Sequence, residues 1–301
     1  MHRHPASTQW IPILGYHRVV DEMPPHDRCW LCMSRRQFER QMEWFARLGY
    51  HTLSLEEAGR RLLHEERIPP RHFVITFDDG YIDTLTVAAP VLRRFGFPAT
   101  VFVVTGLVGD QNTWDDHREC LAPLMNWEQI RQWCAMGFSV GSHTVSHPRL
   151  SQIPLCDVRN ELVASRRTLE AQLGMPVQTL CYPYGDWSED VCRLVPDAGY
   201  AVACNDAGRR EHGPCILART DPRCWPTLLA PLVCSEPWYF AANRRGMLPG
   251  VQRAMHFLWH NFAHQPAQEV RPWRTRVRND LVHHTSFTGM RRPAVREEVV
   301  E

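Results

Sequence analysis

Short apolar runs alternate along the chain with segments in which apolar residues recur at helical spacing. Consecutive apolar residues predict buried strands, whereas apolar residues three and four positions apart predict helices with one buried face. Strands are predicted at residues 11–14, 73–77, 99–104, 138–140, 177–182, 201–204 and 216–218. Helices are predicted between most of them, at residues 35–48, 54–64, 81–95 (interrupted by Pro90), 126–137, 157–173 and 188–198.

Strands that alternate with helices predict βαβ units and a parallel sheet. About seven such strands favour an α/β fold of the distorted (β/α) barrel type, closed or nearly closed, over residues 10–225. An open, doubly wound sheet is the alternative. It is disfavoured because no glycine-rich dinucleotide fingerprint follows any predicted strand.

The alternation fades after about residue 225, so residues 226–301 are predicted to form a less regular, partly helical C-terminal extension. A helical pattern at 251–264 has one apolar face. We expect that face to pack on the barrel, with peripheral contact to a membrane surface as the alternative. Residues 271–278 and 291–301 are charged and interrupted by proline, which predicts a loosely ordered tail.

Composition and charge narrow the class of protein. The net charge is +1, so no nucleic-acid partner is expected. All 34 basic residues are arginine, which excludes chemistry that needs a lysine, such as Schiff-base formation. The 11 cysteines lack framework spacing, no run approaches the ~18 apolar residues of a membrane span, and residues 1–9 lack a signal-peptide core. These features predict a cytoplasmic protein, with attachment to the periphery of the inner membrane as the alternative.

The strand predicted at 73–77 runs directly into Thr-Phe-Asp-Asp-Gly. Adjacent carboxylates leave a strand end in different directions, so one of Asp78 and Asp79 can ligate a metal while the other acts on a water. Two aspartates before a glycine are also common in plain turns. The motif alone therefore leaves both interpretations open.

A second motif, Gly-Ser-His-Thr-Val-Ser-His, follows the strand predicted at 138–140. His143 and His147 are four residues apart and can converge on one metal if the segment makes a helical turn. With one aspartate from the first motif they supply three ligands, the number that leaves coordination positions open for water and substrate.

Other candidate residues follow further predicted strands. Tyr184 lies in a Tyr-Pro-Tyr-Gly turn that can aim a backbone N–H into a cleft. His17 follows the first strand, at the strand end where barrel active sites are built. Trp114 suits either a sugar surface or loop packing.

In these motifs the chain resembles the polysaccharide deacetylase family, carbohydrate esterase family 4. The resemblance covers roughly residues 10–225. The opening Ile-Leu-Gly-Tyr-His-Arg-Val and the Tyr-Pro-Tyr-Gly turn are similar to the branch that includes the poly-N-acetylglucosamine deacetylases. In that branch the motif order is circularly shifted, so that the catalytic-acid histidine lies near the N-terminus.

The resemblance implies a role for each motif residue. Asp79, His143 and His147 would bind a divalent metal, expected to be zinc, with cobalt, nickel or iron as alternatives. Asp78 would be the general base.

The resemblance also implies roles for one residue of the Tyr-Pro-Tyr-Gly turn and one residue of the opening segment. Tyr184 would donate its backbone N–H to the oxyanion, and His17 would be the general acid. Many family members carry an arginine before the Pro-aromatic turn that pairs with the base, but this chain has none there. Arg219, after the last predicted strand, is the candidate replacement.

The implied reaction is hydrolytic removal of an N-acyl group, such as acetyl, from an amino sugar in a glycan or in a lipid-linked or nucleotide-linked saccharide. A metal polarises the amide carbonyl and acidifies water, and a histidine can protonate the departing amine. One alternative is a non-catalytic carbohydrate-binding barrel. The other is a non-haem iron oxygenase, whose metal is also held by two histidines and a carboxylate. The paired aspartates and the α/β alternation speak against the oxygenase.

Overall fold

The computed structural model describes residues 11–24, 27, 31–114, 121–205 and 215–224. They all belong to the first of the two units into which the chain divides, Met1–Ala263. The second unit, His264–Glu301, and the extension predicted at 226–301 lie outside the described residues.

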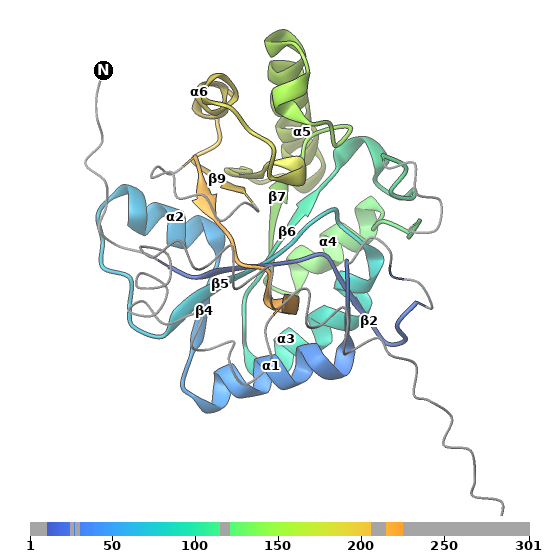
Figure 1. Ribbon diagram of the computed structural model, residues 1–301, viewed down its shortest axis with the longest axis vertical. Helices are drawn as coiled ribbons and strands as arrows, with labels where there is room; N and C mark the ends of the chain where they lie inside the picture. Colours follow the sequence, from blue (N-terminus) through green and yellow to red (C-terminus); the bar gives the residue numbers. More distant parts are fainter. Residues whose placement is uncertain (1–10, 25–26, 28–30, 115–120, 206–214, 225–301) are drawn as a thin grey trace, which may run out of the picture. The chain divides into compact units, whose positions relative to one another are not determined.

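Seven parallel strands among the described residues follow one another around a nearly closed, distorted (β/α) barrel (Figure 1). In spatial order they are β1 (Ile13–Tyr16), β5 (His72–Phe77), β6 (Thr100–Val103), β7 (Ser139–Ser142), β8 (Thr179–Cys181), β9 (Val202–Asn205) and β10 (Leu217–Ala218). A further strand, β4 (His51–Leu53), pairs in parallel with the first three residues of β5, His72 to Val74. The predicted fold class is confirmed.

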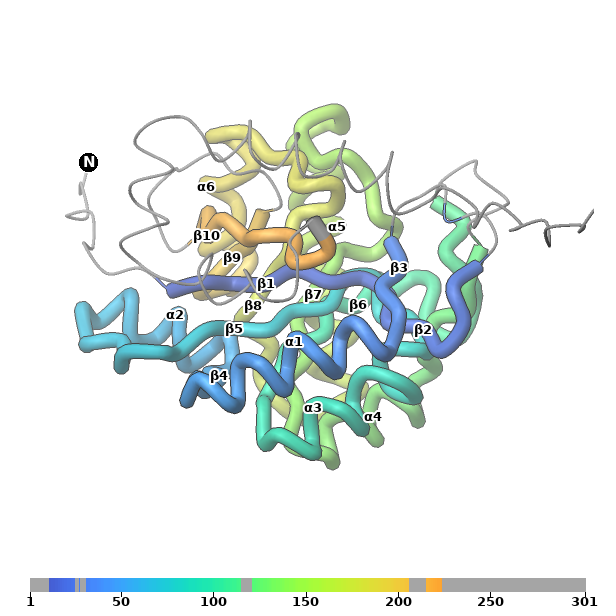
Figure 2. Tube along the Cα trace, turned by 60° about the horizontal axis from the view of Figure 1, so that its bottom comes forward, coloured from blue at the N-terminus to red at the C-terminus, as the bar shows by residue number. Residues whose placement is uncertain are grey.

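The barrel closes where the chain leaves β10 and meets β1. The backbone N–H of Thr220 donates to the carbonyl of Ile13 at 2.8 Å, and the N–H of Gly15 donates to the carbonyl of Thr220 at 3.0 Å. Figure 2 shows the β10 segment running beside β1. The first and last strands of the sequence are therefore neighbours, which brings their carboxyl ends together.

Helices cover the outside of the sheet: α1 (Arg35–Arg47), α2 (Leu55–Leu63), α3 (Ala89–Phe95), α4 (Trp127–Ala135), α5 (Leu155–Leu173) and α6 (Glu189–Asp197). Their ends carry local caps. Asn126 and Gln129 form a reciprocal capping box at the start of α4, and Gly174 ends α5 in the left-handed conformation. No helix among these residues combines the length and the apolar character needed to span a membrane.

The segment predicted as one helix at residues 81–95 is divided. A π-helical stretch, Thr84–Ala88, precedes α3. Pro90 has no N–H to donate, and its ring would clash with the carbonyl of Thr86 in a regular α-helix. A wider turn ahead of the proline avoids this clash. The two-stranded pair of β2 (Arg18–Val20) and β3 (Cys32–Ser34), and the strand β4, were not predicted because three residues are too few to show a periodicity.

Alternate residues of β5 face opposite sides of the sheet. Phe73, Ile75 and Phe77 pack against helices in the main apolar cluster, whereas Val74 belongs to a second cluster, with residues from β1, β6, β8 and β9 and from helix α2. Such two-sided burial explains why the strands are almost continuously apolar in sequence. With the same alternation, Asp78 extends the side of the strand occupied by Val74, toward the barrel interior.

Candidate metal centre

The two aspartates at the end of β5 contact different neighbours. The N–H of Asp78 donates to the carbonyl of Tyr16 at 2.9 Å and so continues the pairing with β1. Asp79 has a left-handed φ of 69°, and Gly80 follows with φ 82°. This reversal turns the second carboxylate away from the first. Asp78 contacts Arg219 and His17, and Asp79 contacts the two histidines of the second motif.

The two histidines come from the end of β7. The N–H of His143 donates to the carbonyl of Val103 at 2.9 Å, which extends the pairing with β6 by one residue. The two histidines converge without the helical turn that would be one way to bring His147 alongside His143. The chain instead takes left-handed conformations at Thr144 (φ 68°) and His147 (φ 60°), which fold the loop back so that the histidine rings lie 4.8 Å apart.

Three candidate ligand atoms converge in this place. The Nε2 atoms of His143 and His147 each lie 3.4 Å from Oδ1 of Asp79, and the ligand atoms all lie within 4.8 Å of one another. The three side chains are 2%, 6% and 4% exposed. Among the described residues no hydrogen bond reaches Oδ1 of Asp79. A buried carboxylate oxygen between two imidazole nitrogens is a donor set that fits a divalent metal ion.

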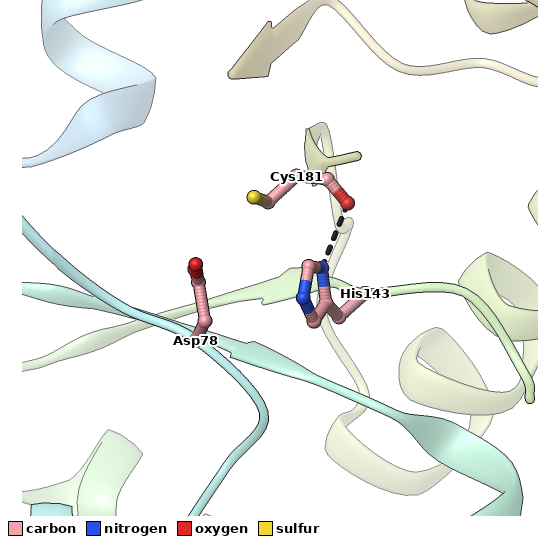
Figure 3. A group of neighbouring side chains, drawn as sticks. All are labelled: Asp78, His143 and Cys181. Atoms are coloured by element: carbon pink, nitrogen blue, oxygen red, sulfur yellow. Dashed lines mark hydrogen bonds between the residues drawn. The ribbon is translucent and has the colours of Figure 1, made fainter. Parts of the chain in front are cut away.

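A backbone carbonyl orients the first histidine. Nδ1 of His143 lies 2.8 Å from the carbonyl oxygen of Cys181, as Figure 3 shows. The carbonyl can only accept, so Nδ1 carries the proton and Nε2 presents its lone pair to the site. Sequence reasoning missed Cys181, because a contribution made through the main chain leaves no side-chain signal.

A second group of candidate ligands, Asp78, His143 and Cys181, is also drawn in Figure 3. It is a poorer metal site because both oxygens of Asp78 already accept hydrogen bonds from Arg219. We therefore assign the metal site to Asp79 and the two histidines.

Electrostatics favour the ionised form of Asp79. Burial alone would raise the pKa of this carboxyl, but the electrostatic interactions with the imidazoles of His143 and His147 outweigh burial and hold the pKa well below its ordinary value. The group is thus a carboxylate, the form in which it can ligate a cation.

Arg219, which follows β10, contacts Asp78, which follows β5. Its two terminal nitrogens donate to the two carboxylate oxygens at 2.6 and 2.5 Å, and one also donates to Thr76 at 3.1 Å. Burial would raise the pKa of Asp78, but the charge and hydrogen bonds of Arg219 lower it to about 2. Gly15 makes room for this arginine, since a Cβ there would lie 3.3 Å from the guanidinium carbon.

His17 lies on the same side of Asp78. Its Nε2 is 3.6 Å from Oδ2 of Asp78, and its side chain is 19% exposed. The closure of the barrel places it there, because β1 runs between β5 and the segment that follows β10. The structure therefore brings both His17 and Arg219 to the carboxylate of Asp78.

Tyr184 borders the site from the β8 side. It sits in a tight turn, Pro183–Gly185, with a left-handed φ of 59°, and its ring centroid lies 4.6 Å from that of His147. Trp114 stacks on the same histidine, with its centroid 4.4 Å from that of His147, and the guanidinium carbon of Arg149 lies 4.1 Å from the centroid of the Tyr184 ring. These aromatic and cationic groups form the rim around the ligands.

Comparison with known proteins agrees with the geometry. The polysaccharide deacetylase family matches residues 65–203. YxkH of Bacillus subtilis is 27% identical over 212 residues, covering 69% of this chain and 70% of that protein. The poly-β-1,6-N-acetyl-D-glucosamine N-deacetylase of Staphylococcus aureus is 26% identical over 172 residues, and the chain spans 58% of its length. The solved structure of the Streptococcus pyogenes deacetylase PplD in complex with acetate has a TM-score of 0.64 and 28% identity, covering 75% of this chain and 98% of that one.

The fold and the site define a nearly closed (β/α) barrel with a candidate metal site at the carboxyl ends of its strands. Over residues 65–203 the chain belongs to the polysaccharide deacetylase family, carbohydrate esterase family 4. The predicted membership is confirmed. The matched residues 65–203 include both aspartates, both histidines and Tyr184, whereas His17 and Arg219 lie outside them.

Proposed function

We propose that this protein is a metal-dependent hydrolase that removes an N-acyl group, in the first instance acetyl, from an amino sugar of a saccharide. The observation that carries the proposal is the separation of two buried carboxylates. Asp79 faces two imidazole nitrogens, while its neighbour Asp78 is held apart by Arg219. A ligand and a proton acceptor side by side are what metal-assisted hydrolysis needs.

Asp79, His143 and His147 would hold the cation, which we propose to be zinc, with cobalt, nickel or iron as alternatives. When bound, such an ion polarises the acyl carbonyl and makes water a stronger acid. With three protein ligands, the donor set leaves coordination positions for water and the acyl oxygen.

Asp78 would take a proton from the attacking water. Its low pKa keeps it ionised at neutral pH, and the two hydrogen bonds from Arg219 hold both oxygens in one orientation. The oxygen of the water then bonds to the acyl carbon. The Tyr184 turn would supply a backbone N–H to the oxyanion that forms, a contribution on the order of 10²–10³ in rate.

His17 would protonate the nitrogen of the amino sugar as the C–N bond breaks, so that acetate and a free amine leave. A general acid typically contributes on the order of 10²–10⁴ in rate. The distance of 3.6 Å between Nε2 of His17 and Oδ2 of Asp78 supports this role, because an acid and a proton acceptor from the ends of two different strands lie close together.

The substrate class is proposed from the rim and from the relatives. The Staphylococcus aureus relative is named for poly-β-1,6-N-acetyl-D-glucosamine, and Trp114 and Tyr184 offer aromatic surfaces of the kind that pack against sugar rings. We therefore propose saccharides that contain N-acetylglucosamine. Location in the cytoplasm, with contact to the inner membrane as the alternative, remains our prediction from the sequence.

The test is incubation of the purified protein and Zn²⁺ with N-acetylglucosamine oligosaccharides of β-1,4 and β-1,6 linkage. Mass spectrometry should show products that have lost acetyl groups, and Asp79→Ala should show none. Oligosaccharide binding without any release of acetate by the wild-type protein, whichever of the four metals is supplied, would favour the carbohydrate-binding alternative and contradict the proposal.

A further inference from the structure

The loop that carries both histidines, residues 143–147, is held by hydrogen bonds to its backbone. Its two left-handed residues, Thr144 and His147, are not glycines, so this conformation needs support from its surroundings. On one side, the N–H groups of Thr105 and Gly106 donate to the carbonyls of Thr144 and Val145 at 3.1 and 2.9 Å. Gly106 permits this approach, because a Cβ there would lie 2.6 Å from the Val145 oxygen.

On the other side the loop is held by a single carboxylate, that of Glu161 on α5. Oε2 of Glu161 accepts from the N–H of Val145 at 2.7 Å and from the N–H of Ser146 at 3.0 Å. Oε1 accepts from the hydroxyl of Ser146 at 2.6 Å. Hydrogen bonds to an ionised acceptor are roughly twice as strong as neutral ones. Glu161 thus binds two of the three residues that lie between the candidate ligands.

One helical turn further along, Ser165 gives α5 a second contact with this region. Its hydroxyl accepts from Ser142 at 2.8 Å, and Ser142 in turn accepts from the N–H of Thr144 at 3.2 Å. Helix α5 packs beside β7, as Figure 1 shows. Helix α5 therefore contacts the loop directly through Glu161 and, by way of Ser142, through Ser165.

We propose that Glu161 is a positioning residue for the metal site, whose carboxylate holds the loop so that His143 and His147 both face Asp79. The inference rests on the proposed function, because it assumes that these three residues bind a metal. Neither Val145 nor Ser146 contributes a candidate ligand, so three hydrogen bonds to this pair act on the histidines at either side. Glu161 would act through the loop and would not touch the cation.

The experiment is a titration of the full-length, metal-free protein with Zn²⁺ in competition with a chromophoric chelator. Glu161→Ala should bind Zn²⁺ on the order of 10–100-fold more weakly than wild type, the usual effect of removing a group that orients a ligand. Glu161→Gln should bind within a few-fold of wild type, because its amide can still accept from the backbone and donate to Ser146. Glu161→Asp, one methylene shorter, should fall between Ala and wild type.

Glu170→Ala is the matched control. Glu170 lies on the same helix and accepts from the N–H of Val177 at 3.1 Å, but it has no contact with the histidine loop among the described residues. Its loss should lower thermal stability without changing Zn²⁺ affinity. A Glu161→Ala protein that folds and binds Zn²⁺ as tightly as wild type would overturn the inference. If Glu161→Ala does not fold, wild-type affinity in Glu161→Asp would overturn it instead.

The same titration separates the two proposals. If the wild-type protein binds no Zn²⁺, cobalt, nickel or iron, the metal site and this inference fall together. If wild type binds Zn²⁺ and all three Glu161 variants bind it equally well, only the positioning role is refuted.

Discussion

Arg219 donates two hydrogen bonds to Asp78, at 2.6 and 2.5 Å, across 141 positions of sequence. Both side chains are 1% exposed. A planar guanidinium that donates to both oxygens of a carboxylate fixes the orientation of the carboxylate and also stabilises its negative charge. The pair thus joins the end of β5 to the end of β10, at the seam where the barrel closes.

Replacing Arg219 should be costly. Arg219→Met leaves a buried carboxylate without its cation, and breaking a buried pair in this way typically costs about 3–5 kcal/mol. Denaturant unfolding at pH 7 measures the loss. Arg193→Met is the control, since Arg193 is 71% exposed and its pairs lie at the surface, where they contribute about 0–1 kcal/mol. Equal stability of the two variants would contradict the assignment.

Acidification should reduce the difference in free energy of unfolding between Arg219→Met and wild type. Because the folded-state pKa of Asp78 is about 2, below its ordinary 3.8, its pairing stabilises the wild-type fold above pH 3.8, and that stability is lost as pH falls toward 2. In the variant, burial without the arginine raises the pKa, so protonation relieves the unpaired charge. Unfolding curves at a series of pH values should converge in acid. A gap that widens below pH 5 would show that the pairing is not the source of the lost stability.

Metal removal should abolish activity. We expect a chelator to eliminate acetate release and Zn²⁺ to restore it, because the proposed function assigns Asp79 and the two imidazoles to the metal ion that polarises the acyl carbonyl. Elemental analysis of the chelated protein must accompany the assay. Undiminished turnover in a preparation shown to contain no metal would end the metal-dependent proposal.

The paired aspartates should separate into two phenotypes. Asp79→Ala should lose Zn²⁺ and activity together, because a ligand is gone. Asp78→Asn should retain Zn²⁺ and lose kcat, because an amide cannot accept the proton. Equilibrium Zn²⁺ titration and steady-state kinetics measure the two effects. Loss of Zn²⁺ from Asp78→Asn with retention in Asp79→Ala would reverse the assignment.

His17→Ala should fold and bind Zn²⁺ normally but lose on the order of 10²–10⁴ in kcat on an acetamido sugar. The loss should shrink on an activated acetate ester, whose leaving group departs without a proton. Tyr16→Phe is a useful neighbour control, because it removes the hydroxyl that donates to Gln41 and keeps the aromatic ring. Equal losses on the amide and on the ester would make His17 a structural residue and leave the acid unassigned.

Sequence alone predicted the fold class and named the three candidate ligands that the structure brings together, because the signals for both are local. The alternation of apolar runs with helical periodicity is a property of short windows, and it placed the long helices and most barrel strands within a few residues. Asp79, His143 and His147 lie in two compact motifs directly after strands. In a parallel barrel all such strand ends meet at one rim, so motif positions sufficed to bring the three together.

The tertiary structure decided what depends on long-range closure and on backbone conformation. The family resemblance made Arg219 a candidate partner of Asp78, but nothing in the sequence near Asp78 indicates which arginine faces it, since Arg219 reaches Asp78 only because β10 and β1 meet at Thr220. The left-handed turn at Thr144 and its support by Glu161 were likewise not predicted, because the hydrogen bonds from the main chain of Val145 and Ser146 leave no pattern in the sequence. Periodicity reports which side of an element is buried, whereas these contacts depend on how elements distant in sequence are packed together.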